Sequence, residues 1–137
     1  MKDSAEFIEK AREGLKRFKR SGSFKFGPND RLSEVCNAPE VAGGIYLVIG
    51  ISGSRRELYN IGHSGKILEN GDVDLRKDGF RGRFLSGKEK GIPGQGQGTR
   101  NKVWPQKINY FSIEQLEVRW YVTLDSQCEV CPKILKN

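Results

Sequence analysis

The sequence predicts a single α+β domain in which helices pack against a small antiparallel sheet of about three strands. Three observations lead to this class: a helical periodicity near the N-terminus, two β-rich segments joined by a short polar turn, and a later segment of alternating apolar and polar residues. At 137 residues the chain has the length of one domain with its own core. We divide it into an N-terminal helix with a connecting loop, residues 1–43, and a main domain, residues 44–137.

The first helix is expected to begin near Asp3, which can cap it together with Glu6 three residues later. Ser21-Gly22 should end it. The Lys and Arg residues on its other face can meet DNA phosphates, although a solvated helix face is the simpler explanation. Residues 23–43 contain scattered Gly, Pro, Asn and Asp, so we expect a connecting loop there with at most one turn of helix. The apolar residues at helical spacing are Phe7, Ile8, Ala11, Leu15 and Phe18.

Two strands are expected next, paired as an antiparallel hairpin. Segment 44–51 is almost continuously apolar and rich in β-branched residues, so both faces of this strand should be covered. Residues 52–54 (Ser-Gly-Ser) suit a hairpin turn, and residues 57–62 form the returning strand. The last strand is predicted over residues 116–123, where Leu116, Val118, Trp120 and Val122 alternate with polar or amphipathic neighbours.

Between the hairpin and the last strand, the sequence predicts two short helices and one unusual basic segment. Residues 80–85 suit a helix that carries Arg81 and Arg83, and residues 103–111 suit another with a proline near its start. Segment 87–102 holds five glycines, and we expect it to be too flexible to pack. It is either a mobile loop that orders on a phosphate backbone or a plain surface linker. Its cations are Lys88, Lys90, Arg100 and Lys102.

Composition narrows the partners and the compartment. The 24 Lys and Arg residues exceed the 17 acidic ones by 7, and this excess favours a polyanion, with nucleic acid first. The sequence has no apolar run of the roughly 20 residues that span a bilayer and no signal-peptide core, so we expect a cytoplasmic protein. Three cysteines suggest reduced thiols. Cys128 and Cys131 have the spacing of a zinc knuckle or a redox pair, with two ordinary thiols as the simpler interpretation.

Two tripeptides on the predicted hairpin suggest a family. Gly44-Ile45-Tyr46 stands on its first strand and Asn60-Ile61-Gly62 on its second. This pair, followed by a small basic stretch, a basic helix and a final strand, resembles the GIY-YIG endonucleases, and within them the restriction-enzyme branch. The resemblance runs from about Gly43 to the end of the chain.

The resemblance implies a nuclease that hydrolyses phosphodiester bonds in double-stranded DNA, in a restriction or repair setting, with one Mg²⁺ or Mn²⁺ ion. It makes Tyr46 the tyrosine that helps to take a proton from water, with His63 and Lys66 as basic helpers. It makes Arg83 the arginine that binds the phosphate, with Arg81 as the alternative because the helix register is open. Whether such a protein acts as a homodimer is left open.

Two departures from the family pattern stand against activity. Asn60 replaces the tyrosine of the second tripeptide, and Tyr59 lies one residue earlier, which turns it to the other face of a strand unless a bulge re-aims it. The family's metal-binding glutamate falls on Lys136, so Glu129 becomes the candidate metal ligand. The alternative function is therefore an inactive nucleic-acid-binding relic of the same fold. A third candidate is an interaction module whose basicity is incidental.

Overall fold

The computed structural model describes residues 5–16, 18–70, 73–74 and 79–125. Its centre is a four-stranded sheet in the order β1-β8-β2-β3, in which every neighbouring pair is antiparallel. The strands are β1 (Ser21–Phe26), β2 (Ala42–Ser52), β3 (Arg55–Ser64) and β8 (Gln115–Asp125). The α+β class and the antiparallel sheet predicted from the sequence are thereby confirmed.

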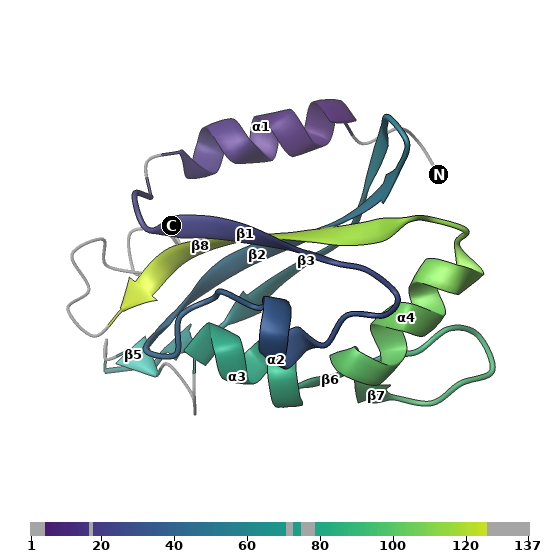
Figure 1. Ribbon diagram of the computed structural model, residues 1–137. Coiled ribbons are helices and arrows are strands. Elements are labelled where there is room, and N and C mark those ends of the chain that lie inside the picture. The colour runs from purple at the N-terminus through teal and green to yellow at the C-terminus, as the bar shows by residue number, and fades with distance from the viewer. Residues whose placement is uncertain (1–4, 17, 71–72, 75–78, 126–137) are drawn as a thin grey trace.

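Helices cover both faces of this sheet (Figure 1). One face packs against α1, and we call it the α1 face; the opposite face packs against α2, α3 and α4, and we call it the three-helix face. The helices are α1 (Ala5–Leu15), α2 (Leu32–Val35), α3 (Gly79–Ser86) and α4 (Arg100–Tyr110). Among the described residues, no helix combines the length and the apolar character needed to cross a membrane.

The predicted hairpin is the middle of the fold. β2 and β3 pair through a turn at Gly53, and β2 also pairs with β8, so β2 has a hydrogen-bonded neighbour on each side. Because β2 is central and covered on both faces, its near-continuous apolar sequence is explained, as the sequence had predicted. The last predicted strand is confirmed as β8.

β1 was not predicted from the sequence, because Ser21-Gly22 were assigned to the end of a helix and the following residues to a loop. Ser21 to Phe26 instead pairs antiparallel with β8 and forms an edge of the sheet. Phe24 and Phe26 alternate into the three-helix face and are buried, so pairing and burial override the weak strand propensity of Ser and Gly.

Two apolar clusters fill the space between the sheet and the helices. The larger lies on the three-helix face and joins strands to α2, α3 and α4. Its large side chains include Phe26, Tyr46, Phe80, Phe84 and Trp104. The smaller lies on the α1 face and consists of Ile8, Phe18, Leu47, Ile49 and Tyr121.

The glycine-rich segment is more ordered than predicted. Its two ends pair as the short strands β6 (Lys88–Glu89) and β7 (Gly98–Thr99), and α4 begins directly after β7. The second small hairpin of the described chain pairs β4 (Lys66–Ile67) with β5 (Val73–Asp74). α4 confirms the predicted helix but starts three residues before 103, which leaves Pro105 inside the helix rather than near its first residue.

Candidate functional site

Tyr46 lies in the middle of β2, opposite Gly62 of β3. Its ring covers this glycine so closely that a Cβ added to Gly62 would lie 2.2 Å from Tyr46 Cζ. The tyrosine is 1% exposed, and its ring meets the ring of Phe84 edge-on at a centroid distance of 4.8 Å. The second tripeptide therefore carries glycine because the first carries tyrosine.

Gly44 has a packing reason of its own. Its pairing partner changes between Gly43 and Gly44, which leaves Thr123 as the extra residue of a bulge in β8. A Cβ on Gly44 would lie 2.1 Å from the Tyr121 carbonyl oxygen, and its φ of +149° is one that side chains rarely adopt. The glycine and tyrosine positions that suggested a family are thus also positions that the sheet itself requires.

Arg100 is the main correction to the expected DNA-binding cations. The sequence analysis placed it in a flexible loop facing phosphates, but it is the first residue of α4, and it is 1% exposed. Its guanidinium donates hydrogen bonds to the Arg83 carbonyl oxygen at 2.7 Å and to the Tyr46 hydroxyl at 3.3 Å. Its Nε lies 3.0 Å from a Glu89 carboxylate oxygen, an ion pair without a hydrogen bond at that nitrogen. Two hydrogen-bond acceptors, on β2 and α3, and an ion pair with β6 thus hold it inside.

Glu89, on β6, is the acidic centre of this network. It accepts a hydrogen bond from Trp104 Nε1 at 3.1 Å and a further one from Lys107, both on α4. Arg100 forms an ion pair with the same carboxylate, so Trp104, Lys107 and Arg100 all contact it. The network therefore holds the β6–β7 hairpin against α4.

The two candidate arginines of α3 have different surroundings. Arg81 donates to the carbonyl oxygens of Cys36 at 2.9 Å and Ser33 at 3.0 Å, and so holds α2 and the residue after it against α3. Arg83 is exposed, and its side chain has no hydrogen bond or ion pair within the described residues. The guanidinium free to bind an external phosphate is therefore that of Arg83.

His63 does not join Tyr46. It pairs with Ile45, one position away from the Tyr46–Gly62 pair, so its exposed side chain belongs to the α1 face while Tyr46 belongs to the three-helix face. The resemblance had implied that His63 assists Tyr46. Strand alternation instead places the two side chains on opposite faces of the sheet. Lys66 begins β4, and its side chain lies outside the described part of the structure.

A bulge in β3 sets the orientation of Tyr59, the tyrosine one residue before the second tripeptide. Val48 pairs with Asn60 and Ile49 with Leu58, which leaves Tyr59 as the extra residue. Tyr59 and Asn60 consequently line the same pocket. The bulge that the sequence analysis named as a condition is present. The Tyr59 ring lies over Gly50, and its centroid is 5.2 Å from the centroid of the Phe111 ring.

Burial raises the pKa of Tyr59, and the nearby charge of Glu57 raises it further. Its hydroxyl is therefore protonated at neutral pH, and it is better suited to donate a hydrogen bond than to take a proton.

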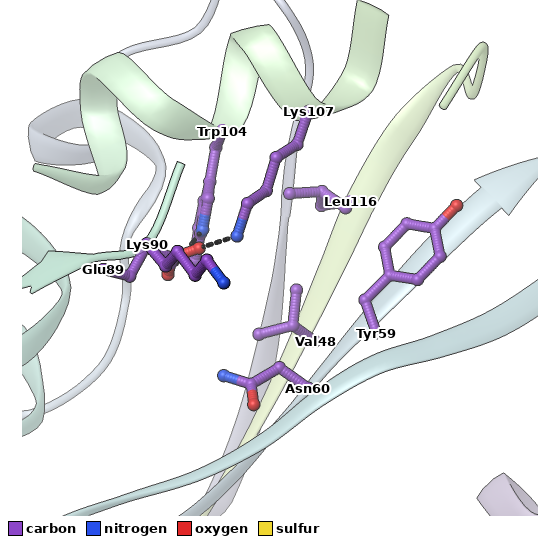
Figure 2. Close-up of a pocket in the computed structure, with 8 residues that line it drawn as sticks. All are labelled: Val48, Tyr59, Asn60, Glu89, Lys90, Trp104, Lys107 and Leu116. Atoms are coloured by element: carbon purple, nitrogen blue, oxygen red, sulfur yellow. Dashed lines mark hydrogen bonds and ion pairs between the residues drawn. The ribbon is translucent and has the colours of Figure 1, made fainter. Parts of the chain in front are cut away.

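A pocket of about 310 Å³ opens on the three-helix face between β3, β6 and α4 (Figure 2). We call it the α4 pocket. Figure 2 shows Lys90 and Lys107 reaching into the space above Val48 and Asn60, with Tyr59 on the far side from Glu89. Its lining residues are Val48, Tyr59, Asn60, Glu89, Lys90, Trp104, Lys107 and Leu116.

The described residues do not fit a divalent cation. No group of three His, Cys, Asp or Glu side chains comes together among them. Glu89, the carboxylate of the α4 pocket, already has Lys107 and Arg100 beside it, and a cation there would meet two like charges. Glu129, the candidate metal ligand, lies outside the described residues, as do Cys128 and Cys131.

Three of the expected DNA-binding cations are on the surface. Lys88, Lys90 and Lys102 are exposed, and none of their side chains has a hydrogen bond or ion pair within the described residues.

Compared with protein-family models, with curated proteins and with solved structures, the chain matches none of them.

Proposed function

We propose that this chain is a domain of the GIY-YIG endonuclease type that binds double-stranded DNA and hydrolyses its phosphodiester bonds, with the divalent cation that this resemblance implies. One observation carries the proposal. Helix α3 packs on Tyr46 through Phe84, with ring centroids 4.8 Å apart, and the neighbouring Arg83 is exposed with a free guanidinium. The candidate phosphate-binding arginine is thus the chain neighbour of the phenylalanine that packs on the tyrosine of the first tripeptide.

The roles of the chain's own residues follow from this packing. Arg83 would bind two oxygens of one phosphate through its planar guanidinium and offset charge that develops there. Arg100 holds the Tyr46 hydroxyl and the Arg83 backbone together, so it positions both without touching DNA. Lys88 of β6 and Lys102 of α4 are exposed and would add contacts to the backbone of the duplex. Because the described residues do not fit the cation, we derive no step through it.

A second candidate function, DNA binding without hydrolysis, has its own support. The Tyr46 hydroxyl is buried and bonded to Arg100, so water has no direct access to it in this conformation. Asn60 also lacks the proton-transfer hydroxyl that the family has at that position. On this account the motif residues serve packing, and the basic surface serves binding.

A plasmid-nicking assay with Mg²⁺ or Mn²⁺ tests the first function. Arg83→Ala should reduce the rate of nicking about 100-fold, which is the scale for losing one group that stabilises developing charge. Arg31→Ala is the matched control, because Arg31 is also exposed but lies before α2. Circular dichroism of each variant confirms that the fold is kept.

The result separates the candidates. Nicking that needs the metal and Arg83 supports the endonuclease, and loss of nicking in Glu129→Ala would give that residue the metal role. No nicking, with DNA retention that weakens steeply as salt rises, supports binding alone. No nicking and no retention rejects both and leaves the interaction module.

A further inference from the structure

The α4 pocket contains two ammonium groups from different elements. Lys90 directly follows β6, is exposed, and has no ion pair or hydrogen-bond partner within the described residues. Lys107 comes from α4, and its side chain is 26% exposed. In Figure 2 both side chains extend into the same space, with the Asn60 amide below them. Lys90 therefore has three N–H donors that an anionic ligand in the pocket can use.

The acidic residue beside the pocket does not cancel this charge. Glu89 bonds to Lys107, but it also forms an ion pair with the buried guanidinium of Arg100 at 3.0 Å. Among the lining residues, Lys90 and Lys107 against Glu89 leave a net charge of +1, two cations minus one anion, and Arg100, which does not line the pocket, pairs with Glu89 from behind the lining. The pocket is therefore electropositive although it contains a carboxylate.

The rest of the pocket suits more than a bare anion. Val48 and Leu116 give it an apolar floor, and Tyr59 closes one side with a partly exposed ring. The Asn60 amide offers two N–H donors and one carbonyl acceptor. The volume of about 310 Å³ lies at the lower end of the range of small-molecule pockets, roughly 300–1,000 Å³. A phosphate joined to a sugar and a base uses the charged, polar and apolar parts together.

We propose that the α4 pocket binds one unstacked nucleotide of a nucleic-acid strand. Its phosphate contacts Lys90 and Lys107, and its sugar and base lie against Tyr59 and Leu116, within reach of the Asn60 amide. A base inside an intact duplex is stacked on both faces, so the ligand is a single-stranded segment or an extruded nucleotide. The inference rests on the proposed function only in taking nucleic acid as the polymer, and it involves neither Arg83 nor a metal.

Titration calorimetry of the full chain tests this with four probes: a thymidine tetranucleotide, thymidine 5′-monophosphate, thymidine and inorganic phosphate. The tetranucleotide should bind most tightly, and thymidine, which has no phosphate, at least about 10-fold more weakly than its monophosphate. Lys90→Gln should weaken tetranucleotide binding about 5-fold. It should also reduce the slope of log K against log salt concentration by about 1, the value for one lost phosphate contact. Lys25→Gln is the control, since Lys25 is exposed on β1, at the opposite edge of the sheet from β3, and does not line the pocket.

Asn60→Asp provides an independent variant at a different wall. Asn60 is exposed, so the change should keep the fold, while the added carboxylate should reduce tetranucleotide binding about 10-fold or more. Equal effects of Lys25→Gln and Lys90→Gln would overturn the proposal, as would binding of thymidine as tight as that of its monophosphate. Binding of the mononucleotide without the tetranucleotide would overturn a strand as the ligand.

The outcome is distinct from that of the nicking assay. Tetranucleotide binding that depends on Lys90, with no nicking of plasmid, would reject hydrolysis and keep this inference. Nicking that depends on Arg83 and is unchanged in Lys90→Gln, without tetranucleotide binding, would reject the pocket and keep the endonuclease.

Discussion

Each face of the sheet holds one acidic side chain between cations, and the two clusters differ in what they join. On the three-helix face, Glu89 meets Arg100 and Lys107. On the α1 face, Glu117 of β8 bonds to Arg119 of the same strand and to Arg56, which reaches it from β3 across β2. The second cluster reinforces strands that backbone hydrogen bonds already connect. The first connects the β6–β7 hairpin, α3, α4 and β2, which no single backbone ladder joins.

This difference indicates where the loss of an ion pair should reduce the stability of the fold most. Arg100 contacts β2 through Tyr46, α3 through the Arg83 carbonyl and β6 through Glu89. If it is removed, the Tyr46 hydroxyl, the Arg83 carbonyl and the Glu89 carboxylate lose a partner together. At Glu117 the loss of one arginine leaves the other in place. We therefore expect the three-helix face to be the more sensitive of the two.

The largest effect should come from Arg100→Leu. This change leaves Glu89 with one cation and removes the donors to the Tyr46 hydroxyl and the Arg83 carbonyl, so the free energy of unfolding should fall by about 3–5 kcal/mol. Urea unfolding measures it. Lys102→Leu, on the exposed side of the same helix, should change it by less than about 0.5 kcal/mol. A loss below about 1 kcal/mol in Arg100→Leu would contradict the comparison.

A smaller effect is expected from Glu117→Gln, with a clear pH dependence. Burial alone would raise the pKa of Glu117, but hydrogen bonds and charges from Arg119 and Arg56 outweigh it and hold this pKa below its usual value. At pH 7 the substitution should cost about 1–3 kcal/mol of unfolding free energy.

The sign of the pH dependence follows from this lowered pKa. The carboxylate stabilises the fold above the pKa of the unfolded chain, and this contribution is lost as the pH falls through the lower pKa of the folded protein. The stability difference between wild type and Glu117→Gln should therefore narrow below about pH 4. Urea unfolding at pH 7, 5 and 3 measures it. A difference that stays constant over this series would show that the charge of Glu117 contributes nothing.

The smallest of these effects should come from Tyr46→Phe. The ring keeps its packing on Gly62 and Phe84, and only the hydroxyl that accepts from Arg100 is lost, so the cost should be about 1 kcal/mol. Thermal unfolding measures it, with Tyr110→Phe as the control because Tyr110 is 52% exposed. Combined with Arg100→Leu, the two costs should not add, since they remove the same bond. Additive costs would mean that the hydroxyl and the guanidinium are independent.

Much of the fold could be predicted because its signals are local. The alternation of Leu116, Val118 and Val122 marked β8, and the β-branched run with a Ser-Gly-Ser turn marked the β2–β3 hairpin. β1 could not be assigned in the same way, because six residues with three small polar or glycine positions give little propensity. Its remaining signal was the alternation of Phe24 and Phe26, which was too short to outweigh the glycines around it.

The candidate site was harder to predict because its contacts are long-range. The separation of His63 from Tyr46 followed from alternation once the hairpin register was known. The burial of Arg100 had no local signal, since its partners are Tyr46, Arg83 and Glu89, up to 54 residues away. The α4 pocket is equally non-local: Asn60 appeared only as a departure from a motif, and Lys107 was not singled out.

The bulge at Tyr59 also bears on how the length of this chain can vary. On either side of it, Leu58 and Asn60 pair with Ile49 and Val48, which are neighbours on β2, so Tyr59 is supernumerary to the ladder. A deletion of this residue would let the strand close with every other pair preserved, whereas a deletion elsewhere in β3 would shift part of the strand by one position. The hairpin thus contains a place where a codon can be lost without inverting the faces of the sheet. Such a change would alter the wall of the α4 pocket and the edge of the larger apolar cluster, against which Tyr59 packs.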